Sequence, residues 1–162
     1  MPSPEIVLTQ MEQTVSRLAG AKQSVSDWLS ACRTVMLSGV NKNRTTWQFV
    51  HDASVVTATS SVLASTCTVY GLLIGNVETR GECNFFYMTD IAAGNAVGTE
   101  TDTDDWFLYQ IPAAAAATTE EFHPFVFPGG ITFAAGLDVL ADGNAASASV
   151  ANTVRCWILY AV

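Results

Sequence analysis

Basic residues are scarce in this chain. Seven Lys and Arg residues stand against 15 Asp and Glu, and the formal net charge is −8. The seven are scattered along the sequence, whereas binding to phosphates needs clustered cations, so we expect no nucleic-acid partner. Charged residues of both signs make up only 14% of the chain and apolar residues 49%, a composition that favours burial of part of the surface by other subunits.

Long apolar runs are also missing. No stretch approaches the roughly 20 consecutive apolar residues of a membrane-spanning helix, and the N-terminus lacks a basic segment followed by a long apolar one. We therefore expect no membrane partner and synthesis in the cytoplasm.

The cysteines carry no recognisable spacing. Cys32, Cys67, Cys83 and Cys156 form neither a C-x-x-C pair nor a Cys/His pattern. The sequence thus predicts buried free thiols, and neither a zinc site nor a redox motif.

Catalytic motifs are absent as well. His51 and His123 are the two histidines, and the neighbours His51 and Asp52 would point to opposite faces of a strand. No G-x-S-x-G sequence is present, and Gly129-Gly130 lacks the lysine and helix start of a phosphate-binding loop. We expect a protein without enzymatic activity and without a cofactor.

Four of the 15 acidic residues form a dense cluster. Glu100, Asp102, Asp104 and Asp105 alternate mostly with threonines. The segment lacks the glycine and the distal glutamate of an EF-hand loop, so we expect a solvated loop and no metal site, with a calcium site as the alternative.

What the chain does contain begins with a helical period. Ser3-Pro4-Glu5 is typical of a helix start, an apolar stripe follows up to Gly20, and a second amphipathic stretch covers 21–37. Such stripes bury against whatever is nearest, so the pair either packs on its own domain or forms an arm between subunits. The candidate interface residues on these stretches are Leu8, Met11, Val15, Leu18, Val25, Trp28 and Leu29.

A polar linker at 38–44 separates this arm from the rest, which gives two units, 1–44 and 45–162. We expect deletion of residues 1–20 to spare the second unit. Its period is two, and short apolar strands with turn signals between them predict an antiparallel β-sandwich. The expected strands are 46–51, 53–59, 66–74, 83–88, 106–111, 121–127, 131–134, 137–141 and 154–160.

The stretch 120–140 is the clearest part of the β pattern. Phe122, Phe125 and Phe127 precede Pro128-Gly129-Gly130, and Ile131 and Phe133 alternate after it. We expect strand, turn, strand, with a corner where the sheet folds over the core and with glycines at positive φ.

A family resemblance rests on the order of short motifs. They are Tyr70-Gly71, Ile74-Gly75-Asn76, Phe86-Tyr87, Val97-Gly98-Thr99, Ile111-Pro112-Ala113, the run from Phe127 to Phe133, Gly136-Leu137 and Leu159-Tyr160. In these the chain resembles the head decoration (cement) proteins of tailed bacteriophages, which have a jelly-roll-like β-sandwich, and related modules of phage tail fibres.

The resemblance implies a non-enzymatic virion protein, commonly a homotrimer, that binds the outside of the capsid and clamps neighbouring subunits of the major capsid protein. The alternative is a trimeric fibre or spike head that recognises a host surface through its loops. We expect the first, because no long fibrous repeat precedes the sandwich.

Overall fold

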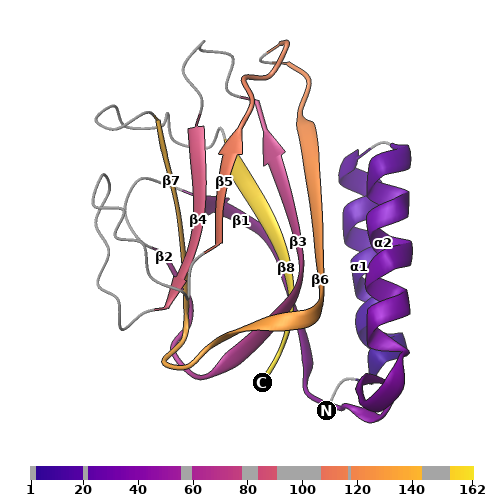
Figure 1. The fold of residues 1–162 in the computed structure, drawn as a ribbon. Helices are drawn as coiled ribbons and strands as arrows, with labels where there is room; N and C mark the ends of the chain where they lie inside the picture. Colours follow the sequence, from indigo (N-terminus) through magenta and orange to yellow (C-terminus); the bar gives the residue numbers. More distant parts are fainter. Residues whose placement is uncertain are drawn as a thin grey trace.

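The computed structural model describes residues 3–19, 22–55, 60–77, 84–90, 107–116, 118–143 and 154–162. Two helices come first and strands follow (Figure 1). The elements are α1 (Pro4–Ala19), α2 (Gln23–Met36), the 3-10 helix η1 (Gly39–Asn43), β1 (Trp47–Val55), β2 (Ser60–Leu63), β3 (Cys67–Asn76), β4 (Asn84–Asp90), β5 (Phe107–Ile111), β6 (Glu121–Phe133), β7 (Leu137–Gly143) and β8 (Val154–Ala161).

The strands form two four-stranded antiparallel sheets. The first sheet has the order β1-β8-β3-β6, and the second has the order β2-β7-β4-β5. Strand 1 thus pairs with strand 8, 2 with 7, 3 with 6 and 4 with 5. A long antiparallel hairpin rolled over onto itself produces this pattern, which is the jelly roll. The predicted fold class, a mainly β antiparallel sandwich preceded by a helical segment, is confirmed.

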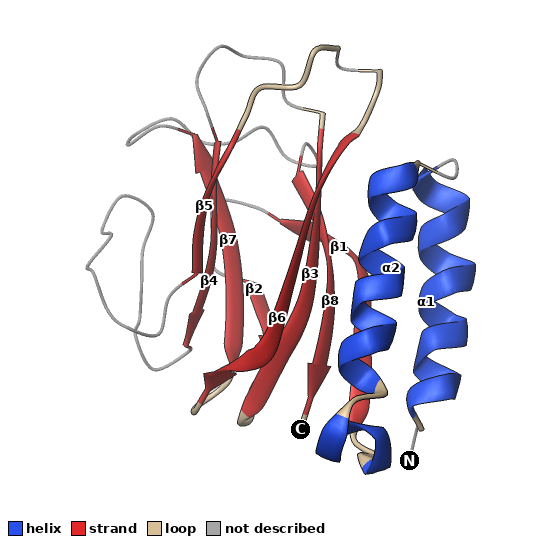
Figure 2. Cartoon of the chain, turned by 45° about the vertical axis from the view of Figure 1, so that its right-hand side comes forward, coloured by secondary structure: helices blue, strands red, loops and turns tan. Residues whose placement is uncertain are grey.

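The chain is built in three layers (Figure 2). The helix pair covers the outer face of the first sheet, and the second sheet lies on its other face. Two hydrophobic cores result, one between helices and first sheet and one between the sheets. None of the helices in the described part of the chain is long and apolar enough to cross a membrane.

Strands β3 and β8 belong to both cores. On β8, Trp157 and Leu159 face the helices, whereas Cys156 and Ile158 face the second sheet. A strand buried on both faces is apolar at nearly every position. The expected two-residue period therefore does not apply to these two strands.

The segment expected to be a polar linker connects the helices to the sandwich. Asn41 is buried, its Nδ2 donates to the carbonyl oxygen of Val35 (3.1 Å), and its own carbonyl accepts a hydrogen bond from Trp47 Nε1 (3.4 Å). The Arg44 guanidinium lies 5.7 Å from the centre of the Trp47 ring and 5.6 Å from that of Tyr70. The two expected units thus share one core, while the division at residue 44 stays a prediction.

The predicted turn at 128–130 lies inside one strand, so the expected end of a strand there was wrong. On β6, Val126 pairs with Gly71 of β3 and Ile131 pairs with Val69, so four residues of β6 lie opposite the single residue between them. Gly130 has φ 74°, and below this bulge β6 bends toward the second sheet (Figure 1). The break predicted by Pro-Gly-Gly is a break in pairing, and it allows the strand to turn the expected corner.

Other strand predictions were partly right. β1 is one strand with an irregularity between Val50 and Ala53, where two strands were expected, and the short β2 was not expected. The alanine run 113–117 was predicted to be a loop, and its described part, 113–116, is one. The acidic cluster at 100–105 lies outside the described residues.

Candidate interaction surface

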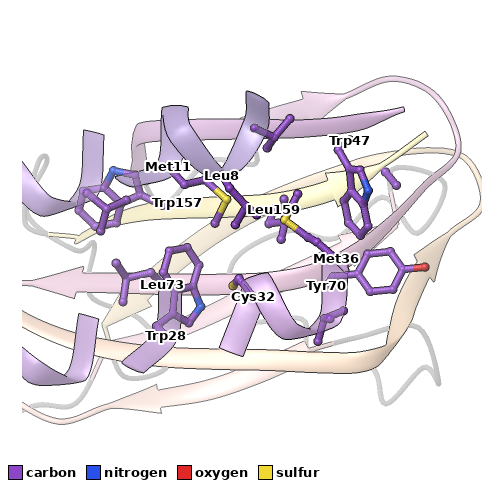
Figure 3. Close-up of a cluster of buried hydrophobic side chains, with 14 of the residues drawn as sticks. Leu8, Met11, Trp28, Cys32, Met36, Trp47, Tyr70, Leu73, Trp157 and Leu159 are labelled. Atoms are coloured by element: carbon purple, nitrogen blue, oxygen red, sulfur yellow. The ribbon is translucent and has the colours of Figure 1, made fainter. Parts of the chain in front are cut away.

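The described side chains among the predicted interface residues lie on the side of the helix pair that faces the first sheet. Of the seven, Leu8, Met11, Val15, Val25 and Trp28 are at most 5% exposed in the core shared with the first sheet (Figure 3). Leu29 is partly buried against the same core, and the side chain of Leu18 lies outside the described ones. The chain's own sheet therefore occupies the apolar stripe. A role of these residues in contacts between subunits stays a prediction.

Helix α2 comes very close to β3. A Cβ atom on Gly71 would lie 2.8 Å from Cys32 Sγ and 3.4 Å from the Trp28 ring. Trp28 also donates a hydrogen bond from Nε1 to the carbonyl oxygen of Phe125 (3.0 Å), on edge strand β6. Gly71 provides the space and Trp28 fixes the position of the helix along the sheet.

At the other end of the sheet, Glu120 forms an ion pair with Arg155 of β8 and also contacts Lys22 at the beginning of α2. Arg155 Nε donates to Glu120 Oε2 (2.9 Å), and a second contact joins Arg155 Nη2 to Glu120 Oε1. Lys22 Nζ donates to the Glu120 carbonyl oxygen (2.8 Å) and lies 5.3 Å from the Phe122 ring centre. The sequence analysis did not predict the pair of Arg155 and Glu120. The feature that could have indicated it is a single arginine in the otherwise apolar run from Val154 to Ala161.

A groove runs between α2 and β6. It has a volume of about 340 Å³ and is lined by Ser24, Asp27, Trp28, Ala31, Pro124 and Val126. Most of its surface is apolar, and the exposed Asp27 carboxylate accepts a hydrogen bond from Gln23 Nε2 (2.8 Å). Trp28 is thus a predicted interface residue that also borders this groove.

The described thiols are not nucleophiles at neutral pH. Burial raises the pKa of Cys32 and of Cys156 to about 12. Burial and, secondly, the negative charge of Asp90 raise the pKa of Cys67 to about 11. Because the thiolate is the reactive form, all three behave as core residues. They are free, as the sequence predicted, while Cys83 lies outside the described residues.

The two histidines have different surroundings. His51 is exposed and stacks on Phe49 with ring centres 6.1 Å apart, whereas His123 is partly buried and contacts Tyr109. Three of the tryptophans, Trp28, Trp47 and Trp157, are core residues, and Trp106 lies outside the described residues. Within the described part of the chain, no group of three or more His, Cys, Asp or Glu side chains could hold a metal ion.

Comparisons with known proteins give only distant likenesses. No protein-family model matches the chain, and no curated protein matches it in sequence. Among solved structures, the chain is similar to the coat protein of tobacco streak virus in two structures, with 15% and 13% identity and a TM-score of 0.34 in both. These alignments cover 72% and 71% of this chain and 87% and 82% of the coat protein.

The chain is also similar to VP2 of infectious bursal disease virus, at 9% identity and a TM-score of 0.31, over 72% of this chain and 29% of VP2. TM-scores this low do not establish a shared fold. The class of the protein, a jelly roll with a helix pair packed on one sheet, therefore rests on its own strand order.

Proposed function

We propose that the protein is a structural component of a virion that binds the outside of a phage capsid and clamps neighbouring subunits of the major capsid protein. The observation that carries the proposal is the strand pairing 1–8, 2–7, 3–6 and 4–5 in two sheets, the jelly-roll architecture found in viral capsid domains. The sequence resemblance to phage decoration proteins supports the phage origin and the outer position.

Composition supports an assembly role. Only 14% of residues are charged, and such a surface is suited to burial against other subunits. On a repeating lattice, many modest contacts made by one homotrimer act together, so that each can be weak while the whole holds firmly. Stabilisation of the capsid then comes from avidity rather than from one tight interface.

The buried stripe determines which helix surface is open to the capsid. Because the apolar sides of α1 and α2 hold the pair on the first sheet, contact in this proposal is made by their outer sides and by the groove beside α2. The exposed residues on the outer sides include Glu5, Ile6, Thr9, Gln10, Glu12, Gln13, Ser26, Ser30 and Thr34. They are mostly uncharged and polar, as in the rim of a protein interface.

The test is binding to capsids that lack the chain. We expect the purified protein to cosediment with such capsids and to raise the temperature at which they release their genome. Arginines introduced together by Ser26→Arg and Ser30→Arg on α2 should weaken binding by about tenfold or more. The matched control, Thr118→Arg with Thr119→Arg, changes two exposed residues before β6 and should bind like the wild type.

Failure to cosediment would contradict the proposal. If the same preparation bound host glycans or cells, the alternative of a fibre or spike head would replace it. If both double variants bound capsids equally well, the protein would still be a capsid-binding protein, but the outer sides of the helices would not be the contact surface.

A further inference from the structure

An aromatic seam closes one edge of the sandwich. It consists of Phe107 and Tyr109 on β5 and His123, Phe125 and Phe127 on β6, the edge strands of the two sheets. The centre of the Phe107 ring lies 5.0 Å from that of Phe125 and 5.3 Å from that of Phe127. The centre of the Tyr109 ring lies 4.7 Å from that of Phe125. All five side chains are partly buried, so the seam lies at the border between the inter-sheet core and solvent.

His123 joins the two sheets within this seam. The Tyr109 hydroxyl lies 3.1 Å from His123 Nδ1, at hydrogen-bonding distance. His123 Nε2 is buried and has no hydrogen-bond partner among the described residues. A neutral imidazole has one N–H and one acceptor nitrogen, so it satisfies Tyr109 in either tautomer and leaves one position unpaired.

Protonation changes this balance. The imidazolium has two N–H donors, and while Nδ1–H can donate to the Tyr109 oxygen, Nε2–H is buried without an acceptor. A buried charge with an unpaired donor is costly, whereas in the unfolded chain water solvates both groups. The folded chain therefore binds this proton less readily than the unfolded chain.

The groups that face His123 leave this conclusion intact. From β5 comes Tyr109, whose pKa burial raises, so that it stays a neutral phenol in the physiological range. From β3 the paired residue is Ile74, which is not ionisable. On β6 itself Glu121 is the nearby charge, and its Oε1 accepts a hydrogen bond from the amide of Ala115 (3.3 Å). Burial lowers the pKa of His123 and the charge of Glu121 opposes this as the smaller influence.

We propose that His123 is an acid-sensitive latch that joins the β5 and β6 edges when neutral and releases them when protonated. The pKa of His123 in the folded chain is below its value of about 6.5 in the unfolded chain. The contribution of the neutral His123 to the stability of the fold is therefore fully present above about pH 6.5 and is lost as the pH falls through the folded pKa. The latch does not depend on the proposed role in a virion, because it concerns how the sandwich is closed.

Thermal unfolding at about pH 7.5 and about pH 5 tests the proposal with a matched pair of variants. Carboxylates titrate in the same range, so the readout is the difference between variants. Wild type and the exposed-histidine control His51→Gln should lose roughly 2–4 °C more on acidification than His123→Gln does. Equal losses in the wild type and His123→Gln would overturn the proposal.

A second measurement does not depend on the folding of His123→Gln. An NMR titration of the ring protons in the wild type, assigned with His51→Gln, should give a midpoint for His123 below about 6.5. Amide exchange on β5 and β6, corrected for its intrinsic pH dependence, should become faster in the same interval. A midpoint at or above about 6.5, or exchange that stays constant through the titration, would contradict the latch.

Discussion

Gly71 lies in β3 where α2 passes closest to the first sheet. The interior of a strand ordinarily favours β-branched or aromatic residues, and glycine there often marks close approach of another part of the chain. Here that part is α2, because Cys32 Sγ would lie only 2.8 Å from a Cβ at this position. Neighbouring Leu72 and Leu73 are fully buried, so the strand has no freedom to move away.

Replacing Gly71 with Val should therefore destabilise the protein by about 1–3 kcal/mol through overpacking. Urea denaturation measures the change. Gly129→Ala is the control, since a Cβ at Gly129 has nothing within 4 Å and should change stability by about 0.5 kcal/mol or less. An unchanged midpoint for Gly71→Val would contradict the close packing of α2 on β3.

At the scale of elements, the helix pair behaves as a layer of the fold. α1 buries Val7, Leu8, Met11 and Val15 in the core that it shares with the first sheet. The first sheet contributes Trp47, Leu73, Trp157 and Leu159 to the same core. Removing α1 would expose part of this core to water, while α2 would still cover β3 and β6.

Deletion of residues 1–20 should thus destabilise the sandwich, contrary to the expectation from the sequence. Each fully buried side chain of this kind contributes about 1.5–3 kcal/mol, a large share of the roughly 5–15 kcal/mol that stabilises a typical domain. We expect a lower thermal midpoint and binding of a dye that reports exposed apolar surface. Deletion of residues 1 and 2 is the control, because it keeps Ser3, whose carbonyl oxygen accepts a hydrogen bond from the Val7 amide at the start of α1 (3.2 Å). A truncated chain with the wild-type midpoint would restore the view of the helix as a separable arm.

At the scale of the whole molecule, we expect copies of the chain to associate with one another. Edge strand β6 carries the exposed Pro124 and Pro128, which have no backbone N–H, so pairing of this edge with a second copy is disfavoured. Contacts between copies on this side of the molecule would instead be made by side chains. The low charge fraction favours self-association, and the resemblance implies that the assembly is a homotrimer.

Light scattering tests this expectation. A trimer has three times the 17.3 kDa of the single chain, and the mass should fall toward the single-chain value on dilution if the contacts are modest. A constant mass of 17.3 kDa at the highest attainable concentration would remove self-association. Capsid binding would then be made by single copies.

Part of the candidate site could be predicted from the sequence and part could not. The stripe of Leu8, Met11 and Val15 predicted a buried helix face, which is confirmed, because helical spacing places these residues on one side whatever they contact. The stripe does not name its partner, since apolar burial is not directional. The His123–Tyr109 contact could not be predicted either, because it joins strands whose adjacency depends on how the sheets stack.

By itself the sequence determined the local elements: two helices, an antiparallel sandwich of short strands, a break at Pro128-Gly129-Gly130 and free thiols at the three described cysteines. These follow from period, backbone propensity and turn chemistry, which act over a few residues. Only the tertiary structure decided that strand 1 pairs with strand 8, that β3 and β8 are buried on both faces, and that the helices cover their own sheet. Those outcomes depend on contacts between distant parts of the chain, where many pairings satisfy the same apolar pattern and packing selects one.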